Sequence, residues 1–265
     1  MIVFPHPKRA EIISFLKELR QEMIAAIEAL DNGAFVRQNW SYHEEGGGEI
    51  SLLRGQHFEK AAVNWSGVGG KNFPADQEQG AFFATGVSLI THMSNPHAPT
   101  AHFNLRMIET EKKYWFGGGY DLTPMGFPYS EDSNYFHQIS RTALEKYPGL
   151  YEEFAQNAAS YFYIPHRKKE RGAGGLFFDS LNSGNFEKDY TLWKLIGKTF
   201  LKAILPIYQK RLNQPYTAEE KEIQLYQRGH YVEFNLVYDR GTKFGFQSGG
   251  NPEAILCSLP PLVRW

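Results

Sequence analysis

The sequence predicts an α+β domain in which helices cover an antiparallel sheet. One helical segment is followed by strand-like segments between residues 34 and 109, helical segments fill the middle, and strand-like segments return near the end. Neither a repeat, a low-complexity linker nor a change of composition divides the 265 residues. We therefore expect one domain spanning residues 1–265.

The amino-terminal part is predicted to hold one helix and the first strands of the sheet. Residues 8–30 repeat apolar side chains every three or four positions, which is typical of an amphipathic helix. Residues 34–66 are predicted to form two or three strands around a glycine turn. Strands at 84–92 and 101–109 are separated by a short proline-containing loop, which favours an antiparallel pair.

The second half is predicted to be helical and then to return to the sheet. Helices are expected at residues 131–147, 149–163 and 188–213. Thr217 and Glu220 have the spacing of a capping box, which predicts that another helix begins there. Alternating apolar residues then predict strands at 231–238, 243–248 and 254–259.

Composition excludes several classes of function. A net charge of −1 argues against a nucleic-acid partner held by bulk electrostatics. Aromatic residues make up 15% of the chain, which suits a large flat ligand as well as an ordinary core. The one cysteine, Cys257, excludes an intramolecular disulfide and cysteine-rich metal centres, and its apolar neighbours predict burial. With no leader-like segment or membrane-length apolar run, we expect a cytoplasmic protein without a membrane span.

The predicted strand at 101–109 carries an unusual polar face. His102, Asn104 and Arg106 alternate with apolar residues, so the three polar groups share one face. An imidazole, an amide and a guanidinium together suit an anionic ligand that forms hydrogen bonds. Residues 117–119 are predicted to form a glycine turn that presents Asp121. A fixed cation and a fixed carboxylate indicate a ligand with carboxylate and N–H groups.

Each of these features has a simpler interpretation. Asp121 is equally well explained as an Asx-turn residue, and Arg106 as a surface ion-pair partner. The basic run at 166–171 is either a solvated helix end or a cradle for carboxylates. The glycine-rich loop at 247–252 is expected to expose backbone N–H donors for a ligand carboxylate.

Histidines are a second candidate constellation. His92, His97 and His102 recur every five residues, and His137 and His166 lie on or beside predicted helices. Several imidazoles can hold a divalent metal. The spacing is not that of a one-helix metal motif, and no carboxylate completes a recognisable set, so histidines without metal are the favoured interpretation. His102 is the best acid–base candidate because it shares a strand face with Arg106.

Taken together, these stretches resemble the oxygen-dependent coproporphyrinogen III oxidase family. The matching segments follow the family order and cover most of the chain from residue 33 onward: residues 86–88 with His92, then 102–106, 115–124, 161–167, 171–179, 231–242 and 259–261. Several long motifs in one order are much more specific than any single match.

The resemblance implies a flat antiparallel sheet sandwiched between helices and a homodimer. It implies that two propionate groups of coproporphyrinogen III are oxidatively decarboxylated to vinyl groups, which gives protoporphyrinogen IX for haem biosynthesis. Molecular oxygen is the expected oxidant, and carbon dioxide and hydrogen peroxide are the expected by-products. No organic cofactor is expected, and a divalent metal remains a candidate.

The resemblance also suggests roles for individual residues. Asp121 matches an aspartate that engages pyrrole N–H groups, Arg106 an arginine that holds a propionate, and His102 a proton donor. The expected substrate-contacting positions are Ser88, Asn104, Arg106, Gly249, Gly250 and Asn251. The positions that match histidines described as metal ligands are His92, His102, His137 and His166.

The chain also departs from the family pattern. Asn251 stands where arginine is frequent, Ala173 replaces a larger aliphatic residue, and relatives are expected to extend further at the carboxyl end. The alternatives are a non-catalytic tetrapyrrole-binding protein and a metal-dependent enzyme that uses the histidines. The joint presence of Asp121, Arg106 and His102 favours the oxidase.

Overall fold

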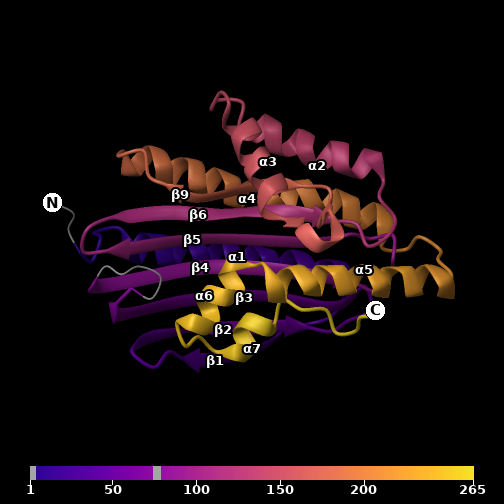
Figure 1. Cartoon of the computed structure of the whole chain (residues 1–265), viewed down its shortest axis with the longest axis horizontal. Helices are drawn as coiled ribbons and strands as arrows, with labels where there is room; N and C mark the ends of the chain where they lie inside the picture. The colour runs from indigo at the N-terminus through magenta and orange to yellow at the C-terminus, as the bar shows by residue number, and fades with distance from the viewer. Residues whose placement is uncertain (1–3, 74–78) are drawn as a thin grey trace.

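A computed structural model describes residues 4–73 and 79–265. Seven strands form one antiparallel sheet in the order β1-β2-β3-β4-β5-β6-β9 (Figure 1). They are β1 (Val36–Ser41), β2 (Glu45–Leu53), β3 (Phe58–Asn72), β4 (Gln79–Met93), β5 (Thr100–Thr110), β6 (Tyr114–Thr123) and β9 (Gly175–Leu181). The predicted α+β class with an antiparallel sheet is confirmed.

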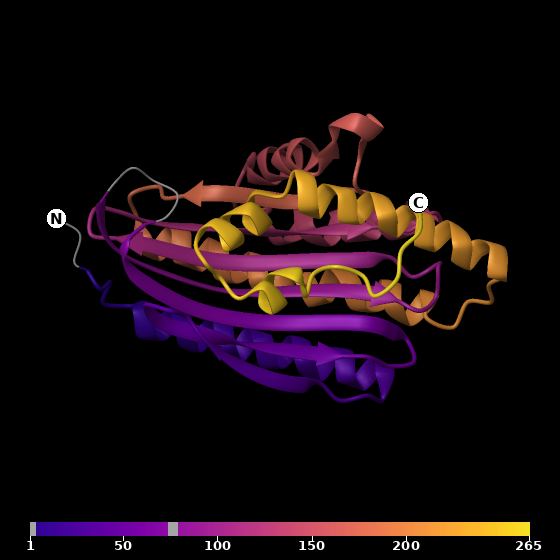
Figure 2. The ribbon, with the colours of Figure 1, turned by 60° about the horizontal axis from the view of Figure 1, so that its bottom comes forward.

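Helices cover both faces of this sheet, and Figure 2 shows α1 and the carboxyl-terminal helices on opposite sides. The face packed by α1 and α4 also receives side chains from α2 and α3. The helices are α1 (Arg9–Asp31), α2 (Ser130–Ala143), α3 (Leu150–Tyr161), α4 (Phe186–Arg211), α5 (Ala218–Val237), α6 (Arg240–Gln247) and α7 (Pro252–Leu256). A small hairpin of β7 (Tyr163–Ile164) and β8 (Lys169–Glu170) encloses the 3-10 turn η1 (Pro165–Arg167).

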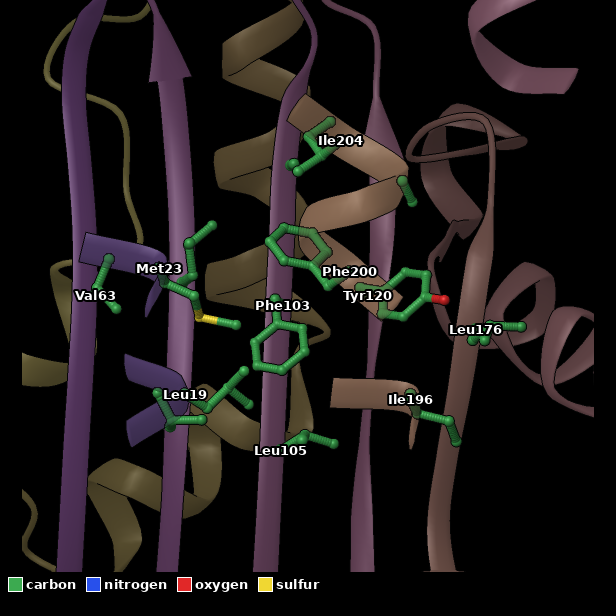
Figure 3. Packing of buried hydrophobic residues seen from close by; sticks show 14 of the residues in the cluster. Leu19, Met23, Val63, Phe103, Leu105, Tyr120, Leu176, Ile196, Phe200 and Ile204 are labelled. Carbon is green, nitrogen blue, oxygen red and sulfur yellow. The ribbon is translucent and has the colours of Figure 1, made fainter. Parts of the chain in front are cut away.

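The main hydrophobic core lies between the sheet and helices α1 and α4. Phe103 and Leu105 of β5 are fully buried on this face, as the strand alternation predicts. Phe103 contacts Phe200 of α4 with ring centroids 5.0 Å apart, and Met23 of α1 belongs to the same cluster (Figure 3). Each such burial contributes about 1.5–3 kcal/mol of hydrophobic free energy, which fixes β5 with its other side chains facing away from this core.

The opposite face of the sheet meets helices α5, α6 and α7 at separate places. Tyr231 of α5 and Cys257, just after α7, pack with Ile90, Ala62 and Ile50. Phe234 of α5 packs on Phe177 of β9. Phe244 of α6 packs at the other end of the strands, against the cluster of Phe73, Phe82 and Ile108. The predicted burial of Cys257 is confirmed.

The three strands predicted near the carboxyl end are wrong. Residues 231–238 lie almost entirely in α5, and residues 243–248 belong largely to α6. The capping box at Thr217 does form, and the helix that it begins continues for 20 residues. Its buried face follows helical spacing but includes polar side chains: Gln224, Arg228, Tyr231 and Asn235. Because polar residues occupy several buried positions, the sequence of this helix lacks the apolar repeat that predicts an amphipathic helix.

The last predicted strand, 254–259, is also replaced by helix. Asn251 caps α7 by accepting a hydrogen bond from the Glu253 N–H at 2.9 Å, and Asp239 caps α6 from the Thr242 N–H at 2.7 Å. Short polar side chains in these positions favour helix starts over strands. The helices predicted in the middle of the chain are confirmed, with ends that differ by a few residues.

The three glycines at 117–119 form the middle of β6 and not a turn. Gly117 pairs with Arg106, and Gly119 pairs with both Asn104 and Phe177. A Cβ on Gly119 would collide with the carbonyl oxygen of Leu176, so glycine allows the close approach of β9. Asp121 therefore projects from a strand that is paired on both sides, by β5 and β9. Among the described residues, no helix is both long and apolar enough to cross a membrane.

Candidate functional site

The polar face predicted for β5 is present and is half-buried. His102, Asn104 and Arg106 point away from the main core, toward the side of the carboxyl-terminal helices. Ser88 of β4 lies directly opposite Asn104, and Asp121 of β6 lies opposite His102. The structure thus brings together five of the residues selected from the sequence. We call His102, Asn104, Arg106 and Ser88 the polar stripe.

Asp121 lies behind the polar stripe and is held by three side chains. Its side chain is 2% exposed, while that of His102 is 22% exposed. His102 Nδ1 lies 3.0 Å from Oδ1, Arg171 Nη2 donates to the same oxygen at 2.6 Å, and Thr123 Oγ1 donates to Oδ2 at 3.1 Å. A carboxylate can only accept, so the proton of neutral His102 is on Nδ1. Nε2 is then an acceptor, 3.5 Å from Asn104 Nδ2.

The surroundings of Asp121 keep it ionised. Burial alone would raise its pKa, but the Arg171 guanidinium and the His102 hydrogen bond lower the pKa of Asp121 to about 2. At neutral pH the site therefore holds a fixed negative charge directly behind an imidazole. This arrangement orients the ring of His102 and stabilises a positive charge when one develops on it.

Arg171 belongs to the candidate site through its contact with Asp121, but it is not among the residues selected from the sequence. Its side chain is 3% exposed, and its guanidinium lies over the rings of Phe162, Tyr231 and Phe234 at 4.2–4.8 Å. Asn235 Oδ1 accepts a further hydrogen bond from Nη1 at 3.1 Å. The charge is thus paired with Asp121 and shielded by aromatic faces. The basic run at 166–171 has two interpretations from the sequence, a solvated helix end and a cradle for substrate carboxylates. Arg171 fits neither, because it is buried and paired with a carboxylate of the protein.

Local backbone contacts place Arg171 beside β6. The Ala173 N–H donates to Leu122 O at 2.8 Å, and the Leu122 N–H donates to Gly174 O at 3.0 Å. A Cβ on Gly172 or Gly175 would collide with carbonyl oxygens of β6, so these glycines allow the close approach. The glycines at 172–175 are therefore the sequence signal for a segment that packs on a neighbouring strand.

Arg106 lies flat across β6 at the other end of the polar stripe. Its Nη1 donates to Asn104 Oδ1 at 2.7 Å, and its Nη2 donates to Asp179 of β9. Gly117 lies beneath the guanidinium, because a Cβ there would be 2.9–3.0 Å from Nε and Cζ. The side chain is partly exposed, so its unused N–H donors remain available to an anion.

The four histidines predicted as metal ligands contact different partners. His92 is fully buried and donates from Nε2 to Ser258 O at 2.8 Å, and burial lowers the pKa of its ring well below the ordinary value. His137 contacts Ala173 O, and His166 contacts Glu233, while His102 contacts Asp121. Within residues 4–73 and 79–265 no three His, Cys, Asp or Glu side chains form a group that could hold a metal ion. The metal set stays a prediction without geometric support.

The loop at 249–251 is held by its own hydrogen bonds. The Gly249 N–H donates to Phe246 O at 3.1 Å, and the Gly250 N–H donates to Gly245 O at 2.9 Å. These bonds end α6, and Asn251 begins α7. The expectation of free N–H donors in this loop is therefore wrong for Gly249 and Gly250. Contact of Gly249, Gly250 and Asn251 with a substrate stays a prediction.

Comparison with known proteins defines the class to which this fold and site belong. Residues 11–265 match the family model described as coproporphyrinogen III oxidase. The chain belongs to the coproporphyrinogen III oxidase family. Oxygen-dependent coproporphyrinogen-III oxidases of Rickettsia bellii and Rickettsia rickettsii are each 47% identical to it over 253 residues, which is 92% of this chain and 90% of the relative. That of Rickettsia akari is 46% identical over the same length.

Proposed function

We propose that the chain catalyses the oxygen-dependent oxidation of coproporphyrinogen III to protoporphyrinogen IX in haem biosynthesis. Each of two propionic acid side chains becomes a vinyl group and releases carbon dioxide. Each step transfers two electrons and two protons to one molecule of oxygen, which becomes hydrogen peroxide. The family match supports the reaction, and the buried, ionised Asp121 behind His102 is the structural observation that carries the proposed site.

His102 is proposed to move the proton that the oxidation requires. A porphyrinogen is electron-rich, and its reaction with oxygen is favoured once a pyrrole N–H is polarised or deprotonated. His102 Nε2 is an acceptor on the partly exposed side of the ring, so it suits this task. Asp121 would stabilise the resulting imidazolium without being protonated itself.

Asp121 is proposed to act through His102. Both of its oxygens are engaged, by Arg171 and His102 on one side and by Thr123 on the other. Direct contact with pyrrole N–H groups, which the family resemblance suggests, would require these bonds to rearrange. Arg171 is then a positioning residue, because it keeps Asp121 ionised and in place.

The remaining polar stripe is proposed to position the substrate. Arg106 has spare guanidinium donors for a propionate, and Asn104 and Ser88 add hydrogen-bonding groups beside it. Because the substrate itself supplies the electrons, the main contribution of the protein is to hold the macrocycle in a fixed orientation relative to oxygen. Gly249, Gly250 and Asn251 are proposed as further contacts.

The assembly and chemical requirements are also proposals. We expect one domain that acts as a homodimer in the cytoplasm, with oxygen as co-substrate and without an organic cofactor. Family membership supports the use of oxygen, which the relatives' name includes. Light scattering of the purified chain tests the dimer, and activity after chelation tests a divalent metal.

Aerobic incubation with coproporphyrinogen III tests the proposed reaction. Products are oxidised to porphyrins and separated by fluorescence chromatography, with an incubation under argon as control. Appearance of protoporphyrin only in the presence of oxygen supports the oxidase. Binding of the substrate without product would favour a tetrapyrrole-binding protein, and loss of activity on chelation would favour the metal-dependent alternative.

A further inference from the structure

Asp179 of β9 bridges two arginines from different parts of the fold. Arg106 of β5 donates from Nη2 to Asp179 Oδ1, and Arg240 of α6 contacts Oδ2 from its Nη2 at 3.0 Å. The Asp179 side chain is 40% exposed, that of Arg106 is partly exposed, and that of Arg240 is exposed. The carboxylate of the chain itself therefore occupies a position between two guanidiniums at one end of the polar stripe.

A β-bulge directs Asp179 to this position. Gly118 pairs with Phe178 and Phe116 pairs with Leu181, so two residues of β9 lie opposite the single Gly117. Bulges of this kind redirect side chains and are frequent next to functional sites. The bulge places Asp179 next to Gly117, over which the Arg106 guanidinium lies. The sheet therefore builds the contact between Asp179 and Arg106, whereas Arg240 reaches Asp179 from the exposed start of α6.

The charges around Asp179 do not cancel. One carboxylate faces two guanidiniums, so the group has a net charge of +1, and Arg106 retains unused N–H donors. Arg240 is fixed independently, because its guanidinium also lies 4.9 Å from the centre of the Tyr161 ring. Asp179 can thus keep Arg240 as a partner when another anion takes its place on Arg106.

We propose that Asp179 is an exchangeable counter-carboxylate, which a carboxylate of the substrate replaces on Arg106. The proposal rests on the proposed role of Arg106 in holding a propionate. Asp179 would keep Arg106 paired and oriented in the free protein and return to it when the bound carboxylate leaves. Asp179 would therefore weaken substrate binding and speed release, which makes it a residue that sets affinity for carboxylated tetrapyrroles.

Anaerobic binding of coproporphyrinogen III to Asp179→Asn tests this proposal without requiring turnover. The dissociation constant is measured by quenching of protein fluorescence. Removal of the competing charge is expected to tighten binding about two- to fivefold, because a partly exposed ion pair is worth up to about 1 kcal/mol. Asp179→Glu should restore a dissociation constant close to that of the original chain. Glu22→Gln, which breaks an exposed ion pair with Lys198, is the matched control and should change nothing.

The tighter substrate binding expected for Asp179→Asn must also depend on Arg106. In an Arg106→Gln background, Asp179→Asn should no longer tighten binding, because no guanidinium is left for the exchange. Unchanged or weaker binding by Asp179→Asn, or an equal gain without Arg106, would overturn the proposal. If the chain fails to oxidise the substrate but shows this dependence on Arg106, the proposed reaction fails and the exchange stands.

Discussion

Arg171 and Asp121 form an ion pair that is almost wholly buried, with Arg171 Nη2 2.6 Å from Asp121 Oδ1. The pair joins the segment before β9 to the neighbouring strand β6, directly beside His102. Buried charges are tolerated when they are paired and hydrogen-bonded, and the removal of one partner is costly. In the proposed mechanism stability and catalysis are both affected by this pair, so substitutions must be designed to separate the two effects.

Asp121→Asn should lower the free energy of unfolding in a pH-dependent way. The folded-state pKa of Asp121 is depressed to about 2, so its stabilising contribution is present above the ordinary pKa of 3.8. That contribution, about 2 kcal/mol, is lost as the pH falls toward 2. Urea unfolding at several pH values should show a constant difference between original and variant above about pH 5, which narrows on acidification. A difference that widens as pH falls would contradict the depressed pKa.

Arg171→Met alone should lower the free energy of unfolding more than the double variant Asp121→Asn with Arg171→Met. It leaves Asp121 unpaired in the interior, which costs about 3–5 kcal/mol. The double variant Asp121→Asn with Arg171→Met removes the unpaired charge and should recover part of this loss in urea unfolding. Turnover should remain low in the double variant, because the charge behind His102 is absent. Recovery of both stability and turnover would show that the pair is only structural.

His102→Asn should reduce turnover and preserve the fold. The asparagine amide can still donate toward Asp121 but provides no acceptor where Nε2 lies. Loss of a positioned general acid–base lowers kcat by about 10²- to 10⁴-fold. The matched control is His57→Asn, in the turn between β2 and β3, which should leave kcat unchanged. Equal effects of the two substitutions would remove His102 from the mechanism.

Gly117→Ala and Gly119→Ala should have different effects although both glycines lie in β6. A Cβ at position 117 would come within 2.9–3.0 Å of the flexible end of Arg106 and displace it. The KM for the substrate should therefore rise several-fold, with stability changed by less than about 1 kcal/mol. At position 119 the new Cβ would meet the backbone of β9, so the sheet must distort and thermal unfolding should occur at a much lower temperature. Similar losses of stability in both variants would argue against the Arg106 explanation.

The polar stripe could be predicted because its signal is local. Alternation within β5 alone places His102 and Arg106 on one face, and the structure confirms it. The pairing of Arg171 with Asp121 could not be predicted in this way, because 50 residues separate them and Arg171 is embedded in a basic run. Its burial among aromatic rings and its contacts with Asp121 and Asn235 distinguish Arg171 from a solvated cation, and all of these are tertiary contacts.

In the carboxyl-terminal helices, by contrast, a local sequence pattern led to the wrong prediction. Alternating Val232 and Phe234 favour a strand over a short window, whereas Thr217 begins a helix that continues through both. Arg228 is fully buried on that helix and is stabilised by Glu59 and by Met93 O. A buried face with paired polar groups gives a weak apolar pattern, so tertiary contacts decide the structure.

The most direct test of the central claim is a single turnover started by oxygen. The original chain and Asp121→Asn are each loaded with coproporphyrinogen III under argon, bound substrate is quantified, and oxygen is then added. We predict that both bind the substrate, that the original chain forms protoporphyrinogen IX, and that Asp121→Asn forms it at least about 100-fold more slowly. Equal rates of product formation, or none by the original chain despite bound substrate, would contradict the proposed site.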